Sequence, residues 1–166
     1  MSGSQSDAAV TALRAFSRGD LGAWWGLPSD CTRADAEAAL GPSEPPEDIG
    51  GVLAGGPCVY RAYAPGAGTP LGVAVWFAGD AAVVIETRSP RLAVGLGKAL
   101  GAPEAVEPSK LGSSRVQWVY AARGLTAHVT SGTGEIFWLY GYTPCAVEDF
   151  LAAPLARVEL RRIPRR

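Results

Sequence analysis

The segment Trp118–Val129, with the sequence WVYAARGLTAHV, decides the fold because it reads as a β-hairpin. Aromatic, β-branched and other apolar residues dominate both sides of Arg123-Gly124, which we interpret as a tight two-residue turn. A further strand-like run follows the loop Ser131–Gly134. The segment therefore predicts an antiparallel meander.

This turn determines which side chains share a face, since successive residues of a strand point to opposite faces. Trp118 is expected opposite Val129, and Ala127 opposite Trp138. The predicted core face, covered by helices, holds Trp118, Tyr120, Leu125, Ala127, Val129, Ile136, Trp138 and Tyr140. The predicted outer face holds Gln117, Val119, Thr126, His128, Thr130, Phe137 and Leu139.

Helices and strands are also predicted before and after this meander. Thr32 begins a helix that ends at Leu40, with Asp35 at the capping-box position. The other predicted helices are Ala8–Arg18, a helix from Ser89-Pro90 to Gly101, and Thr143–Ala153. The other predicted strands are Cys58–Tyr63, Leu71–Phe77, Ala81–Thr87 and a final edge strand near the C-terminus.

Two dipeptides recur at a spacing of sixty residues, which indicates an internal duplication. Leu40-Gly41 returns as Leu100-Gly101, and Val59-Tyr60 returns as Val119-Tyr120. We therefore predict one α+β domain over residues 1–166, made of two tandem α-β-β-β units that form a curved antiparallel sheet with helices packed on one face. The units cover about residues 20–88 and 89–142, and a C-terminal helix and strand occupy 143–163.

A short helix that ends in Leu-Gly, followed by three antiparallel strands, resembles the tandem-repeat fold of beta-lactamase inhibitory protein. It is also similar to the SmpA/OmlA outer-membrane assembly lipoproteins. The residues that carry the resemblance are Thr32–Gly41 with Pro42, Leu100-Gly101-Ala102-Pro103, and the hairpin Trp118–Val129. The resemblance implies that a curved sheet presents aromatic and polar side chains to a protein partner.

The same register argument gives the first unit an outer face. With a turn at Gly79-Asp80, Val75 is expected opposite Val84, and Phe77 opposite Ala82. The predicted partner-binding residues, which join the outer faces of the two units, are Arg61, Tyr63, Trp76, His128 and Phe137. This face is alternatively a second internal layer, covered by the N-terminal helix or the C-terminal segment, or a homodimer interface.

Composition excludes several classes of protein. The 166 residues carry 15 Lys+Arg and 16 Asp+Glu, a balance that makes nucleic-acid binding unlikely as a general role. No apolar run is long enough to span a bilayer, and the first residues lack the pattern of a signal peptide, so a cytoplasmic location is expected. Cys31, Cys58 and Cys145 fit no metal or redox spacing and are expected to be reduced thiols.

No decisive catalytic motif is present. His128, the single histidine, is the one candidate acid or base, and it has no carboxylate close by in sequence. No cofactor or metal is expected. Three hypotheses follow: a non-enzymatic protein-binding module (inhibitor, immunity, adaptor or assembly factor), a small-molecule-binding protein or cofactor-free enzyme with a pocket around His128, and a structural homo-oligomer.

Overall fold

The computed structural model describes Leu27 and residues 31–53, 56–63, 72–92, 100–109 and 111–157. The strands in this part of the chain are β1 (Glu47–Ile49), β2 (Cys58–Tyr63), β3 (Gly72–Ala78), β4 (Ala81–Leu92), β5 (Ala105–Pro108), β6 (Arg115–Tyr120), β7 (Leu125–Thr130) and β8 (Ile136–Tyr142). The helices are α2 (Arg33–Leu40), the short 3-10 helix η2 (Ala121–Arg123), α4 (Val147–Ala152) and α5 (Pro154–Arg157). The fold is α+β, as predicted.

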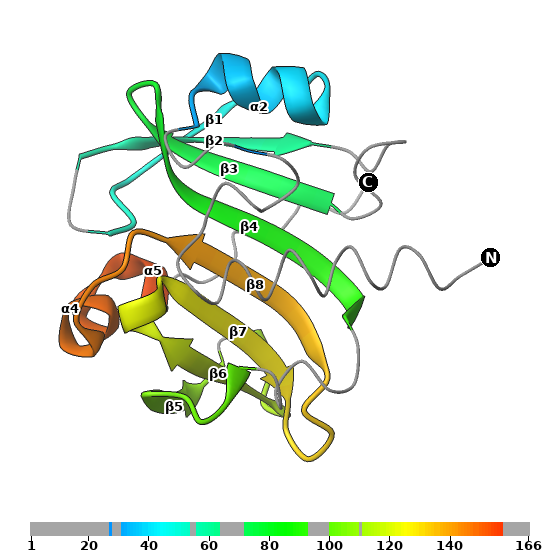
Figure 1. Cartoon of the computed structure of the whole chain (residues 1–166), viewed down its shortest axis with the longest axis vertical. Helices are drawn as coiled ribbons and strands as arrows, with labels where there is room; N and C mark the ends of the chain where they lie inside the picture. The colour runs from blue at the N-terminus through cyan, green and yellow to red at the C-terminus, as the bar shows by residue number, and fades with distance from the viewer. Residues whose placement is uncertain are drawn as a thin grey trace.

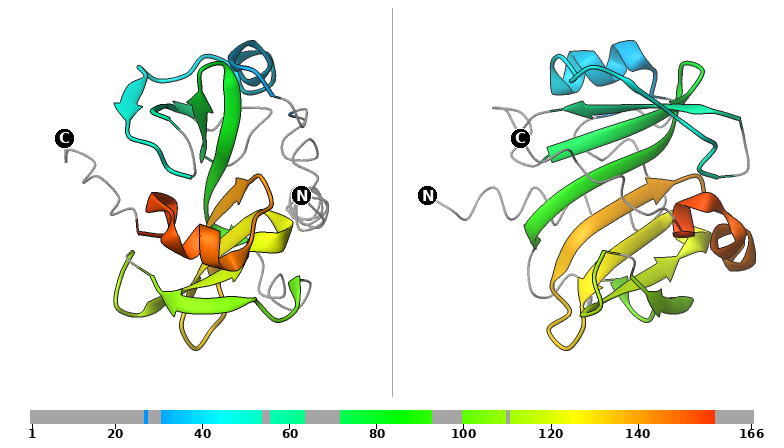
Figure 2. Two further views of the ribbon diagram at one scale, coloured as in Figure 1. Left: turned by 90° about the vertical axis from the view of Figure 1, so that its left-hand side faces the viewer. Right: turned by 180° about the vertical axis from the view of Figure 1, so that it is seen from behind.

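The described strands form one antiparallel sheet in the order β1-β2-β3-β4-β8-β7-β6-β5 (Figure 1). The strands from β1 to β4 make one meander and those from β5 to β8 make a second. The two meanders meet where β4 pairs with β8. Figure 2 shows how strongly the sheet twists between its two ends. The edge strands β1 and β5 were not predicted, because each is short and neither shows a run of β-forming residues.

Helices lie on both faces of this sheet. On one face, which we call the α2 face, Ala36 and Leu40 pack with Phe77 and Leu125 in one hydrophobic cluster. On the other, the α4–α5 face, Phe150, Leu155 and Ala156 pack with residues of the strands in a second cluster. The prediction that helices pack on one face is therefore wrong. Both faces of the sheet are apolar enough to need cover.

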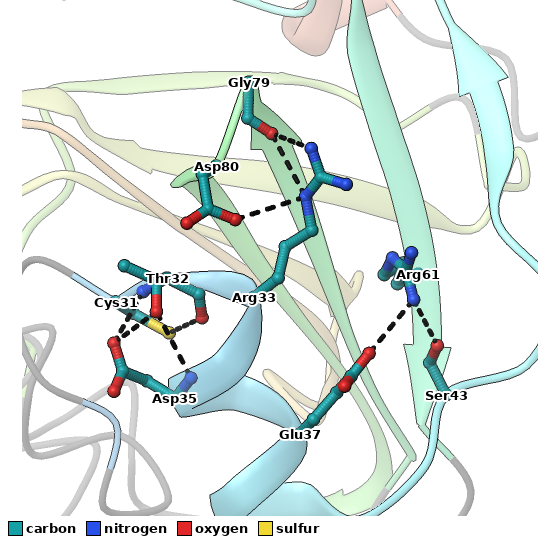
Figure 3. Close-up of polar contacts among 9 residues, drawn as sticks. All are labelled: Cys31, Thr32, Arg33, Asp35, Glu37, Ser43, Arg61, Gly79 and Asp80. Atoms are coloured by element: carbon teal, nitrogen blue, oxygen red, sulfur yellow. Dashed lines mark hydrogen bonds and ion pairs between the residues drawn. The ribbon is translucent and has the colours of Figure 1, made fainter.

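Helix α2 forms as its sequence predicts. The Thr32 hydroxyl accepts a hydrogen bond from the Asp35 N–H, and the Asp35 carboxylate accepts one from the Thr32 N–H (Figure 3). The Thr32 hydroxyl also donates to the Asp35 carboxylate at 2.6 Å, and this bond, together with the one from the Thr32 N–H, lowers the pKa of Asp35. Gly41 ends the helix with a φ of 85°. The capping box therefore marks the start of α2, and the glycine marks its end.

The connection between β6 and β7 is longer than the two-residue turn expected at Arg123-Gly124. The helix η2 occupies Ala121–Arg123, and Tyr120 pairs with Leu125. Each cross-strand pair therefore shifts by two positions, so that Trp118 lies opposite Ala127. A shift of two keeps every side chain of β6 and β7 on its predicted face.

Two β-bulges change the predicted faces of other strands. One lies between His128 and Val129 and leaves Phe137 as the extra residue of β8, so Trp138 lies opposite His128. Trp138 and Tyr140 therefore belong to the α4–α5 face, and Leu139 to the α2 face. The second bulge, between Trp76 and Phe77, places Ile85 opposite Val75 and gives Ile85 to the α2 face, although the predicted pair Phe77 and Ala82 does form.

Other element boundaries also differ from the prediction. Strand β4 continues through Ser89-Pro90 to Leu92, where a helix start was expected. Its register with β8 shifts between Arg88 and Leu92, which is where a strand tolerates a proline. The C-terminal helix begins at Val147 rather than Thr143, and Pro154–Arg157 is helical where a strand was expected. The predicted helix Ala8–Arg18 lies outside the described residues.

The two copies of the dipeptide Val-Tyr do not lie at matching places in the two meanders. Tyr60 packs against the cluster of the α4–α5 face, whereas Tyr120 is buried in the cluster of the α2 face. These two tyrosines are therefore not equivalent positions of a sheet. Leu40 and Leu100 both lie in the cluster of the α2 face, and each precedes a glycine with positive φ.

Candidate functional site

The α4–α5 face combines aromatic rings with buried polar side chains. Its rings are Tyr60, Trp76, Phe137, Trp138 and Tyr140. Its buried polar residues are Glu86, Ser109, Gln117, Thr126 and His128, each no more than 7% exposed. We call these ten residues the polar–aromatic layer. It crosses β2, β3, β4, β8, β7 and β6 in turn.

The rings of the layer contact one another along the sheet. Trp76 meets Tyr60 edge to face at a centroid distance of 5.8 Å and meets Tyr140 in the same way at 6.3 Å. Tyr140 in turn lies 6.4 Å from Trp138 and 5.4 Å from the His128 ring. Edge-to-face contacts of this kind fix ring orientation and leave ring faces directed at other neighbours.

The indole N–H of Trp76 is a buried hydrogen-bond donor of the layer. The side chain is 4% exposed, and its Nε1 has no hydrogen-bond partner among the described residues. A buried N–H without a partner costs about 1–3 kcal/mol, so proteins usually supply an acceptor. Trp76 therefore presents a donor that a bound acceptor would satisfy.

His128 is held in its neutral form. Its Nδ1 lies 2.9 Å from the Ser109 hydroxyl oxygen, which also accepts a hydrogen bond from the Leu111 N–H. We assign the serine proton to the bond with Nδ1, which places the ring proton on Nε2. Burial, with a smaller contribution from the Arg115 charge, lowers the pKa of His128 to about 4.

Two further polar residues of the layer have structural partners. Thr126 donates to the Tyr142 hydroxyl at 2.8 Å, since that hydroxyl itself donates to the Leu125 carbonyl. The Gln117 side-chain amide donates to the Ala156 carbonyl at 3.3 Å and so ties β6 to α5. Stacking of Tyr142 on Phe150, with centroids 4.8 Å apart, fastens α4 to the same region.

Phe137 and Arg115 lie at a more open part of the layer. The Arg115 guanidinium carbon lies 4.0 Å from the centroid of Phe137, which is a cation–π contact. Phe137 also meets the His128 ring at 6.3 Å. The structure therefore brings three of the predicted site residues, Trp76, His128 and Phe137, to one face.

Arg61 and Tyr63, the other two predicted partner-binding residues, lie on the α2 face. Arg61 donates to the Glu37 carboxylate and the Ser43 hydroxyl (Figure 3). Tyr63 is 2% exposed within the cluster of that face, and burial raises its pKa to about 12. The register explains the difference, because Tyr60 rather than Arg61 pairs with Trp76.

The predicted anchors are buried rather than presented to solvent. Tyr63, Trp76 and His128 are each no more than 7% exposed, and Arg61 and Phe137 are half-buried. Across the described ranges, Val106 on the edge strand β5 is the one large hydrophobic residue that is exposed. Of the alternatives for the predicted outer face, a second internal layer fits Trp76 and His128 on the α4–α5 face, where α4 and α5 supply part of the cover.

Sequence reasoning missed several members of the layer. Glu86 lies in a predicted strand, but its burial depends on the pairing of β4 with β8, which no local signal gives. Ser109 reaches His128 only because β5 pairs with β6. Tyr60 was set aside as a repeat marker. The residues Tyr60, Glu86 and Tyr140 could be assigned to one face only once the strand pairings are known, because residues that pair across neighbouring strands lie on the same face.

The structure gives less support to a metal site, a reactive cysteine or a membrane-spanning helix. Within the described residues, no group of three His, Cys, Asp or Glu side chains is placed to hold a metal ion. Cys31 and Cys58 are buried free thiols and Cys145 is a half-buried one. Burial raises the pKa of both Cys58 and Cys145, which disfavours the reactive thiolate. None of the helices in these ranges is both long and apolar enough to cross a membrane.

Comparisons with known proteins bear on the fold and not on the candidate site. No protein-family model matches the chain, and no curated protein matches it. A solved structure, that of a DUF4309 family protein (YjgB) from Bacillus subtilis, superposes with a TM-score of 0.53 at 19% sequence identity. The match covers 84% of this chain and 99% of that chain. At this identity the likeness concerns the fold alone.

Proposed function

We propose that this protein binds a small organic molecule within the polar–aromatic layer of its α4–α5 face. The observation that carries the proposal is the buried indole N–H of Trp76, which has no acceptor among the described residues and belongs to a ring that contacts those of Tyr60 and Tyr140. Binding sites for small molecules combine apolar rings with a few oriented polar groups in this way.

Burial favours a small ligand over a protein partner. A protein interface needs large side chains at the surface that become buried only in the complex. In this sheet the rings and polar groups of the layer are already largely enclosed. The protein-binding module that the sequence suggested would therefore have to use other residues, and it becomes the rival outcome of the tests below.

We infer that the site binds its ligand without catalysing a reaction. A general base works best with a pKa near the working pH, and the lowered pKa of His128 makes it a weak base. The contact between Ser109 and His128 has the length of a nucleophile–base pair, but the ring is bonded through Nδ1, and among the described residues no carboxylate bonds to it. In this proposal His128 acts as an Nε2 donor that orients the ligand.

A ligand-observed NMR screen of a fragment library against the full chain tests the proposal. Trp76→Phe keeps an aromatic ring and removes the donor, so its fold is expected to survive while its hits bind at least about tenfold more weakly. Trp118→Phe is the matched control, because Trp118 packs on the α2 face. Hits that bind both variants equally would contradict the proposal, and loss of folding in Trp76→Phe alone would return Trp76 to a purely structural role.

We further propose that the two meanders are tandem copies of one unit. Strands β2 and β6 correspond when Tyr63 is matched to Tyr120, since both lie in the cluster of the α2 face. The glycines that follow Leu40 and Leu100 support the same relation. The likeness to beta-lactamase inhibitory protein, the cytoplasmic location and the homodimer stay predictions.

A further inference from the structure

The carboxylate of Glu86 lies at the centre of the aromatic part of the layer. Glu86 is 1% exposed on β4, between Ala74 of β3 and Tyr140 of β8, its two cross-strand neighbours. Trp76 follows Ala74 by two residues and Trp138 precedes Tyr140 by two, so both indoles are diagonal neighbours of Glu86 on the same face. Figure 1 shows β4 and β8 side by side in the middle of the sheet.

A carboxylate flanked by indole and phenol rings is chemically suited to an organic cation. The faces of Trp and Tyr rings attract alkylammonium groups, and this attraction grows when water is excluded. A carboxylate in the same place adds a full opposite charge in a weakly screened environment. Lone apolar rings would bind any hydrophobic molecule, but rings around a buried carboxylate discriminate by charge.

We propose that the ligand of this site is a small alkylammonium compound that carries an oxygen acceptor. This inference rests on the proposed function and narrows it to a class of ligand. The ammonium group lies against Glu86, Tyr140 and Trp138, and the oxygen accepts the hydrogen bond from Trp76 Nε1. The small side chains of Ala74 and Ala62 pair with each other in the same row as Glu86, on the β3 side of that residue.

Glu86 already takes part in an interaction in this structure. A bound ammonium group therefore joins or replaces an existing contact rather than filling an empty position. The preference for a cation then comes from the aromatic rings as well as from the carboxylate, which predicts a measurable but moderate discrimination. Two ligands of equal shape that differ only in charge measure it directly.

Choline and its neutral carbon isostere 3,3-dimethylbutan-1-ol are such a pair. We expect calorimetric titration of the full chain to show choline binding about tenfold more tightly than the isostere. Glu86→Gln keeps the size of the side chain and should reduce the preference to about threefold or less by weakening choline binding alone. Glu148→Gln, an exposed carboxylate on α4, is the control for a general charge effect and should leave the preference intact.

Three results overturn the inference. If the isostere binds as tightly as choline, or if neither binds, the ligand is not an alkylammonium compound. If choline alone binds but Glu86→Gln retains the full preference, the cation lies elsewhere. None of these results removes the proposed function, because that proposal stands or falls on whether Trp76→Phe weakens the hits of the unbiased fragment screen.

Discussion

Most buried polar groups discussed for the α4–α5 face have a hydrogen-bond partner that accounts for their burial. Tyr142 and Thr126 satisfy each other inside the sheet, and Gln117 satisfies a carbonyl of α5. Trp76 has no such partner for its indole N–H within the described residues. The Tyr63 hydroxyl of the α2 face is likewise a buried group without a partner in the described part of the chain, so it is the position of Trp76 among the rings of the layer that supports a binding site.

The hydroxyl pair of Tyr142 and Thr126 gives a first prediction. Tyr142→Phe leaves the Thr126 hydroxyl buried without its acceptor and should lower the free energy of unfolding by about 1–3 kcal/mol. Combining it with Thr126→Val should cost less than the sum of the two single changes, since both partners are then removed. Urea denaturation of the four proteins measures this coupling. Strict additivity would show that the bond contributes nothing.

His128 gives a prediction about pH. Its pKa is lowered to about 4 in the folded protein and returns to about 6.5 on unfolding, so the unfolded chain binds the extra proton between these values. The contribution of His128 to stability is therefore complete above pH 6.5 and is lost as the pH falls towards 4. His128→Gln, which cannot gain a proton, should flatten this part of the stability curve.

An NMR titration provides the direct measurement of that pKa. Because His128 is the single histidine, its imidazole resonances need no assignment by mutation. We expect no titration step between pH 5 and 8 in the folded protein. A step near pH 6.5 would mean that the ring is open to water, and the assigned contact with Ser109 would then be absent.

At the scale of elements, turn geometry gives a matched pair of variants. Gly124 has a φ of 65°, and a Cβ there would overlap the carbonyl oxygen of Tyr142, whose N–H donates to the Gly124 carbonyl. Gly79 has nearly the same φ of 64° but open space around it. Gly79→Ala should cost about 1 kcal/mol for the backbone conformation, whereas Gly124→Ala should cost several times more. Equal losses in thermal denaturation would contradict the packing of this turn.

Elements with local signals were predictable from sequence, and those that depend on distant pairing were not. The capping box of Thr32 and Asp35 gave the start of α2. The run of β-forming residues over Cys58–Tyr63 gave the bounds of β2. The bulge at His128 has no such signal, since it arises where β7 must match β8 across a loop. That single extra residue moved Trp138 and Tyr140 to the other face and so added two of the ten residues of the polar–aromatic layer.

At the scale of the whole molecule, the pairing of β4 with β8 makes one sheet of two meanders. Residues of both meanders, such as Phe77 and Leu125, share the cluster of the α2 face. The fold class and the meanders could be predicted from the sequence, but the closure between them could not, because it joins segments about fifty residues apart. The distribution of helices over both faces follows from this closure and was also beyond local reasoning.

This continuity predicts cooperative unfolding. Both meanders should unfold in one transition, so urea curves followed by tryptophan fluorescence and by far-ultraviolet circular dichroism should coincide. Two separate transitions would mean that the meanders are independent units and that the layer is not a single rigid surface.

The indole region of the ¹H–¹⁵N spectrum tests the central claim most directly. The five tryptophans give five indole signals, and Trp76→Phe identifies that of Trp76 by its loss. On addition of the tightest ligand from the screen, we predict that the Trp76 signal moves downfield and shifts most, because its N–H gains an acceptor, while that of Trp118 stays in place. An unmoved Trp76 signal with a shifted Trp118 signal would contradict a binding site on the α4–α5 face.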